Sequence, residues 1–109
     1  MRVQNIFDVY SDPSHAWAKV PMRLLARMGL LNQVSPYSYM RGGFVYLEED
    51  LDLSNFVTAY RQQFNKSPQF REHVSRTRPS KIRSYSHFVI LRVDPNRRRS
   101  YIPGLIPLH

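Results

Sequence analysis

The chain has 109 residues, a formal net charge of +8 at neutral pH, 42% hydrophobic and 13% aromatic residues, and no cysteine. This length accommodates one domain, and the apolar content is too high for a disordered protein. The lack of cysteine excludes disulfides, thiolate metal sites and cysteine nucleophiles. No apolar run approaches the roughly 20 residues of a membrane span, and Asp8 interrupts the first apolar patch. We therefore expect no signal peptide, no membrane and a cytoplasmic location.

Two short strands are predicted at the start of the chain. Residues 6–10 and residues 16–20 alternate in the way that half-buried strands do, and the turn Asp12-Pro13-Ser14 lies between them. In the second strand Trp17 and Lys19 face one side of the sheet, while small apolar residues face the other. A hairpin between the two strands is consistent with this pattern.

A short helix is predicted next. Pro21 is suited to open it, because its missing N–H costs nothing in the first turn, and Gly29 is suited to end it. The apolar positions with near-helical spacing are Leu24, Leu25, Met28 and Leu31. Residues 38–48 then indicate a hairpin, since Gly42-Gly43 supplies the positive φ angles of a two-residue turn.

The second helix has the strongest pattern in the chain. Asp52 or Ser54 is expected to cap its start, and Asn65 with the following Ser67-Pro68 is expected to end it. One continuous apolar stripe runs along it: Leu53, Phe56, Val57, Tyr60 and Phe64. After Pro68 the pattern weakens. Residues 69–78 fit a strand or a loop, and residues 85–93 predict a strand.

These elements predict an α+β fold, with a small antiparallel sheet and two amphipathic helices on one face, in the order ββαββαβ. Residues 1–94 are expected to form the single domain. Residues 95–109 lack periodicity and are expected to form a basic, proline-containing tail that is dispensable for folding.

The charge is distributed very unevenly along the chain. Residues 1–65 carry six basic and six acidic side chains, whereas residues 66–109, called the basic segment below, carry ten basic side chains against Glu72 and Asp94. Such a segment attracts polyanions, and nucleic acid is the usual partner.

Five sequence phrases together resemble small uncharacterised proteins encoded by tailed bacteriophages and prophages. They are His15-x-Trp17, Ser35-Pro36-Tyr37-Ser38-Tyr39, Tyr46-Leu47-Glu48-Glu49-Asp50, Phe70-Arg71-Glu72-His73 and Lys81-Ile82-Arg83-Ser84-Tyr85. The resemblance covers roughly residues 6–88. It implies a phage accessory protein acting in the host cytoplasm, and it implies no particular activity or site.

The candidate binding residues all lie in the basic segment. Guanidinium groups grip phosphates and aromatic faces stack on unpaired bases. We therefore assign the contact to Arg76, Arg78, Lys81, Arg83 and Tyr85, with Arg97, Arg98 and Arg99 as auxiliary phosphate contacts. On an extended segment Lys81 and Arg83 face solvent and Ile82 faces the core, which predicts that removing the two charges leaves stability unchanged.

Nucleic-acid binding without catalysis is the preferred function, and no cofactor is expected. The alternative is an inhibitor of a host protein or nucleoprotein complex, of the anti-defence or anti-CRISPR type, in which the same charges meet an acidic protein surface. A small ribonuclease built on Glu72-His73 and nearby arginines is a third possibility.

Other clusters favour structural roles. The acidic run from Glu48 to Asp52 fits helix-start electrostatics better than a cation site. Four aromatic residues fit a core better than an exposed platform: Trp17, Tyr37, Tyr39 and Tyr46.

Overall fold

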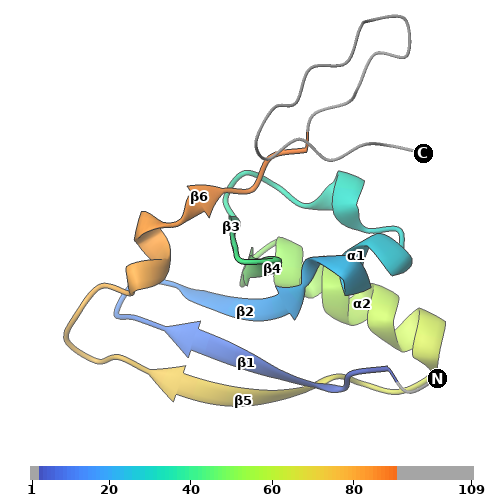
Figure 1. Cartoon of the computed structure of the whole chain (residues 1–109). Helices are drawn as coiled ribbons and strands as arrows, with labels where there is room; N and C mark the ends of the chain where they lie inside the picture. Colours follow the sequence, from blue (N-terminus) through green and yellow to red (C-terminus); the bar gives the residue numbers. More distant parts are fainter. Residues whose placement is uncertain (1–2, 91–109) are drawn as a thin grey trace, which may run out of the picture.

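A single mixed sheet organises the computed structural model, which describes residues 3–90 (Figure 1). Its strands lie in the order β5-β1-β2-β4-β3-β6. Their bounds are β1 Ile6–Ser11, β2 Ala16–Pro21, β3 Tyr39–Arg41, β4 Phe44–Glu48, β5 Gln69–Val74 and β6 Ser86–His87. The helices are α1 Met22–Arg27 and α2 Asp52–Phe64, with short 3₁₀ turns η1 Leu31–Gln33 and η2 Lys81–Ser84. This confirms the α+β class.

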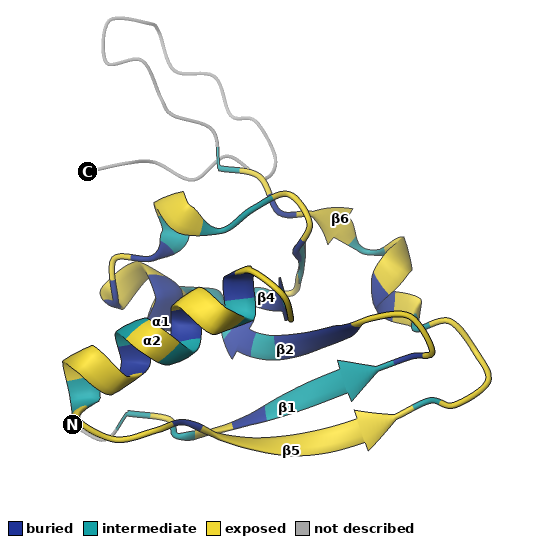
Figure 2. Ribbon diagram, turned by 180° about the vertical axis from the view of Figure 1, so that it is seen from behind, coloured by how far each residue is buried: buried dark blue, intermediate teal, exposed yellow. Residues whose placement is uncertain are grey.

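The expected antiparallel pairing holds for every strand pair in the described residues except one. β5 lies parallel to β1, with Phe7 opposite Phe70 and Val9 opposite Glu72. A parallel partner requires a crossover connection, and α2 supplies it between β4 and β5. β5 is the outer edge of the sheet and is exposed along its whole length (Figure 2). The segment 69–78, which the sequence left open, is therefore an edge strand followed by a loop.

The main core lies between the sheet and the two helices. Phe7 is fully buried and makes edge-to-face contacts with Phe56 and Tyr60 of α2, at ring-centroid distances of 5.2 and 6.0 Å. Leu24 and Leu25 of α1 pack into the same cluster. Both helices therefore cover one face of the sheet, as the sequence predicts.

A smaller core lies on the opposite face of the sheet. Trp17 and Tyr46 are buried there beneath Ile82 of η2, with exposed fractions of 2, 7 and 2%. The burial of Trp17 and Tyr46 agrees with their expected core role. Tyr39 is half-buried at the margin of this cluster, whereas Tyr37 is 71% exposed, so the core assignment of Tyr37 is wrong.

Local turn chemistry agrees with the sequence at most element ends. Gly42 and Gly43 have φ angles of 58 and 80°, as a two-residue hairpin between β3 and β4 requires. Asn65 ends α2 in the left-handed conformation, with φ of 56°. The expected cap of α2 is wrong: the backbone N–H groups of Asp50 and Leu51 donate to the Glu48 carboxylate instead.

Two predictions in the basic segment need correction. Residues 81–84 are not extended, because the Ser80 hydroxyl accepts the Ile82 N–H and starts the 3₁₀ turn η2. Of the expected strand over residues 85–93, the described part up to residue 90 contains only β6, which pairs there with β3. Residues 91–93 and the expected tail lie outside the described residues.

Candidate binding face and cleft

The face of the sheet opposite α1 and α2 is called the open face. Because side chains alternate along each strand and paired residues share a face, the register defines its members. They are Ile6, Asp8, Tyr10, Trp17, Lys19, Pro21, Tyr39, Arg41, Phe44, Tyr46, Glu48, Gln69, Arg71, His73 and His87. Aromatic and basic side chains therefore dominate this face, where Ile82 covers Trp17 and Tyr46, whereas the opposite side is mainly apolar.

Cations and rings are interleaved on the open face. The Lys19 ammonium lies 4.2 Å from the centre of the Phe44 ring, and the Arg41 guanidinium lies 4.9 Å from that of Tyr85. These contacts are worth about 0.5–1 kcal/mol each at exposed sites. They place the cations over half-buried rings, so this face combines positive charge with aromatic groups.

Asp8 organises the end of the open face formed by β1 and β5. The Arg71 guanidinium donates to both of its carboxylate oxygens, at 2.7 and 3.2 Å, and His73 Nε2 lies 2.8 Å from Oδ1. The hydrogen bond from Arg71, followed by that from His73, lowers the pKa of Asp8 from 3.8 to about 2. The His73 ring also stacks on Tyr10, with centroids 4.8 Å apart.

Acidification should therefore reveal the contribution of Asp8 to stability. A carboxylate whose folded pKa lies below its unfolded value stabilises the fold above the unfolded pKa, and this contribution is lost as the pH falls through the folded pKa. For Asp8 the window runs from about pH 4 to about pH 2. Urea unfolding measured across this window should show that the free energy of unfolding falls less steeply with decreasing pH for Asp8→Asn than for the wild type. An equal decrease of the unfolding free energy with pH in the two proteins would contradict the prediction.

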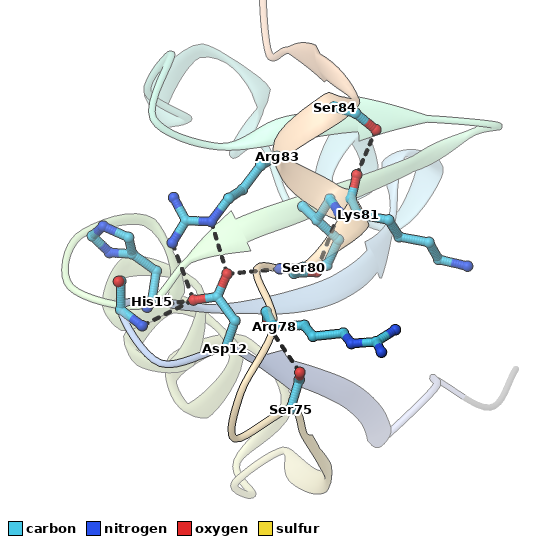
Figure 3. A network of polar contacts seen from close by, with 10 residues as sticks. Asp12, His15, Ser75, Arg78, Ser80, Lys81, Arg83 and Ser84 are labelled. Atoms are coloured by element: carbon cyan, nitrogen blue, oxygen red, sulfur yellow. Dashed lines mark hydrogen bonds and ion pairs between the residues drawn. The ribbon is translucent and has the colours of Figure 1, made fainter.

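Three of the predicted binding residues keep their side chains free. Arg76, Arg78 and Lys81 are exposed, and the structure records no side-chain partner for them within residues 3–90. In Figure 3 the side chains of Arg78 and Lys81 extend away from Asp12 on the same side of the chain. Their positions fit the expected phosphate contacts.

Arg83 corrects the expectation of a free, solvent-facing charge. Its Nε and Nη2 atoms donate to the two oxygens of Asp12 at 2.7 and 3.0 Å (Figure 3). The Asp12 side chain is only 1% exposed. Its pKa lies well below its usual range, first because of Arg83 and then because backbone N–H groups of Ser80, Ser14 and His15 donate to it. Arg83 is thus a structural partner of a buried carboxylate.

The remaining predicted contacts have mixed outcomes. Tyr85 is half-buried against Tyr46, with ring centroids 5.0 Å apart, so its ring is only partly available for stacking. Arg97, Arg98 and Arg99 lie outside the described residues. Glu72 and His73 are neighbours on β5 and point to opposite faces, so the strand does not bring the two groups of the suggested ribonuclease site together.

A cleft of about 400 Å³ opens at the other end of the open face. Five of its lining residues carry aromatic rings: His15, Trp17, Tyr37, Tyr39 and His87. Its charged lining residues are Glu48, Asp50 and Arg83. These residues come from three loops, from β2, β3, β4 and β6, and from η2, so the cleft exists only once the sheet is assembled.

A buried carboxylate holds the walls of the cleft in place. Asp52 is 3% exposed and accepts hydrogen bonds from the Ser35 N–H and from the hydroxyls of Ser35 and Ser38. The Ser38 hydroxyl in turn accepts the N–H of Glu48, at 2.9 Å. This network ties the loop that carries Tyr37 to the end of β4.

Alternation had already placed Trp17 and Lys19 together, away from the aliphatic side of β2. Arg71 and the β3–β4 hairpin that carries Arg41 join this face through the β1–β5 and β2–β4 pairings, which connect positions far apart in sequence. The cleft was missed for the same reason. The separate signals were the aromatic residues near positions 15–17 and 37–39 and the acidic run from Glu48, and no local pattern connects them.

Residues 3–90 contain no helix long and apolar enough to cross a bilayer. In the same part of the chain no three or more histidine, aspartate or glutamate side chains are grouped to hold a metal ion. Comparison with protein-family models, curated proteins and solved structures finds no match to this chain.

Proposed function

We propose that the protein is a non-enzymatic, phage-type accessory protein that binds single-stranded nucleic acid. The interleaving of cations and rings on the open face supports this proposal more than any other observation. Lys19 lies beside Phe44, and Arg41 lies beside Tyr85. A base that displaces the cation from the face of such a ring gains about 1–3 kcal/mol by stacking, and the displaced cation can then pair with a phosphate of the same strand.

The described part of the basic segment supplies phosphate contacts beside this face. Residues 66–90 carry six basic side chains against Glu72 alone. Three of these, Arg76, Arg78 and Lys81, have no side-chain partner recorded in this part of the chain. A single strand is favoured over a duplex, because only unpaired bases can offer their faces to rings set in a sheet.

Binding should therefore be strongly salt-dependent. If about four to six phosphates are contacted, the affinity for single strands should fall by tens- to hundreds-fold between 50 and 200 mM salt. Fluorescence anisotropy with labelled single- and double-stranded DNA and RNA measures this directly. The single strands should bind more tightly, and the RNA should remain intact throughout the titration.

Three variants test where the phosphates bind. The triple variant Arg76→Ala, Arg78→Ala, Lys81→Ala should reduce the salt slope by about 2, which is about 0.7 for each lost contact to a single strand. Its unfolding free energy should change by less than about 0.5 kcal/mol for each substitution, as is usual for exposed charges. The single variants Arg78→Ala and Arg23→Ala form a matched pair. Arg23 is exposed on α1, behind the sheet, so only Arg78→Ala should weaken binding.

No binding to any strand at low salt would overturn the proposal. A pull-down from host lysate, with and without nuclease, then tests the alternative of an acidic host protein. A single stoichiometric band that survives nuclease would favour an inhibitor of a host machine. Cleavage of the labelled RNA, abolished by Glu72→Gln or His73→Ala, would favour the ribonuclease.

A further inference from the structure

The cleft differs in charge from the rest of this basic protein. Glu48 and Asp50 contribute two carboxylates, and the guanidinium of Arg83, which also lines it, is already paired with the buried Asp12. Like charges repel, so a phosphate is disfavoured inside the cleft. A group that enters it must instead offer N–H donors to the carboxylates.

Acceptor capacity is available on both carboxylates. The side chain of Asp50 has no partner recorded within residues 3–90. Each oxygen of Glu48 accepts one backbone N–H, from Asp50 at 2.9 Å and from Leu51 at 3.1 Å, which leaves further lone pairs. Arg83 also lines the cleft, and its recorded bonds use Nε and Nη2, so its Nη1 remains a donor.

The rings of the cleft favour a flat occupant. Tyr39 and His87 stack on each other, with centroids 4.7 Å apart and planes 29° apart. Trp17 meets Tyr39 edge-on at 6.1 Å. Tyr37 is 71% exposed and can close over an occupant from the rim. A planar heterocycle packs against the free faces and edges of such rings better than a branched aliphatic group does.

We propose that the cleft binds an unstacked guanine base of the bound single strand. Guanine is the common base that offers two adjacent donors, N1–H and the N2 amino group, to one carboxylate, while O6 and N7 accept from a cation such as Arg83. Asp50 is the principal acceptor and Glu48 flanks it. Adenine and cytosine offer one amino group beside a ring acceptor, and uracil places carbonyl oxygens on both sides of its N–H, so each brings an acceptor toward the carboxylates.

This proposal rests on the proposed function, because the guanine belongs to a strand held on the open face. It adds base preference at one position. Trp17 supplies a direct signal: it is the only tryptophan of the chain and it lines the cleft. A base bound there changes the emission of Trp17, whereas a strand bound through its phosphates alone does not enter the cleft.

The test uses short uridine oligonucleotides that differ only at one central position, which carries guanine, inosine, adenine or uracil. Inosine lacks only the N2 amino group of guanine. Titrations followed by Trp17 emission and by anisotropy should show guanine bound about 10-fold more tightly than inosine, as expected for one lost charge-assisted hydrogen bond. Asp50→Asn should remove most of this difference between guanine and inosine. Glu49→Gln is the matched control, since Glu49 is exposed and does not line the cleft, and it should keep the guanine preference.

The outcomes separate the two proposals. Equal affinity for guanine and inosine, with salt-dependent binding intact, overturns the guanine site and leaves the proposed function standing. Quenching of Trp17 by tetramethylammonium but not by guanosine also overturns it, and identifies an organic-cation site. Failure of all strands to bind overturns both proposals.

Discussion

Replacing Arg83 with alanine is expected to lower the free energy of unfolding by about 2–3 kcal/mol. The substitution leaves the Asp12 carboxylate, whose side chain is 1% exposed, without its counter-ion. Removing one partner of a buried ion pair costs about 3–5 kcal/mol, because the other charge remains uncompensated. The Arg83 side chain is 35% exposed, and three backbone N–H groups still donate to Asp12, so the expected cost lies below that range.

The control for this prediction is Lys81→Ala, two residues earlier in the same 3₁₀ turn. Lys81 is exposed and should change stability by less than about 0.5 kcal/mol. Urea unfolding measures both variants, and a double-mutant cycle with Asp12→Asn isolates the coupling between Asp12 and Arg83. Equal stability of the Arg83→Ala and Lys81→Ala variants would show that the backbone donors alone are enough to hold the Asp12 carboxylate.

The role of Arg83 also shows what charge patterning cannot reveal. The count of basic residues after position 65 treats Arg83 and Lys81 alike. Their difference arises because Asp12, 71 positions earlier, becomes buried beside η2 and needs a cation. The local conformation also matters. An extended segment over residues 81–83 was expected to point Arg83 to solvent, whereas the 3₁₀ turn η2 brings it to Asp12. The predictions that Ile82 is buried and that Lys81 is exposed are confirmed despite both changes.

Elements that depend on local chemistry were predicted well. The Gly42-Gly43 turn, the left-handed end of α2 at Asn65 and the apolar stripe of α2 all follow from short-range rules. β5 could not be predicted from such rules. An edge strand that is exposed on both faces lacks the alternation that marks a half-buried strand. Its parallel partner β1 lies about 60 residues away, so neither its pairing nor the Asp8–Arg71 contact has a local signal.

Removal of the Asp52 carboxylate by Asp52→Ala is expected to cost about 3–5 kcal/mol of unfolding free energy, the largest effect predicted for this chain. Asp52 is 3% exposed and accepts from the N–H and hydroxyl of Ser35 and from the hydroxyl of Ser38. Each buried donor left without a partner costs about 1–3 kcal/mol. Asp52→Asn keeps the shape of the side chain, but its NH2 group replaces one acceptor oxygen and points at the serine donors. This variant should therefore lose less unfolding free energy than Asp52→Ala and still be less stable than the wild type.

The same substitution tests whether Asp52 also shapes the cleft. Ser35 and Ser38 bracket the loop that carries Tyr37, and Ser38 also bonds to the N–H of Glu48. A destabilised but folded Asp52→Asn variant should therefore show altered Trp17 emission, measured at low temperature where the fold persists. Asp50→Asn is the control, because its carboxylate has no partner recorded within residues 3–90, and it should leave both stability and emission of the free protein unchanged. If Asp52→Asn lowers stability while the emission of Trp17 stays the same, the network supports the start of α2 alone, and the walls of the cleft are held by the stacking of Tyr39 on His87 instead.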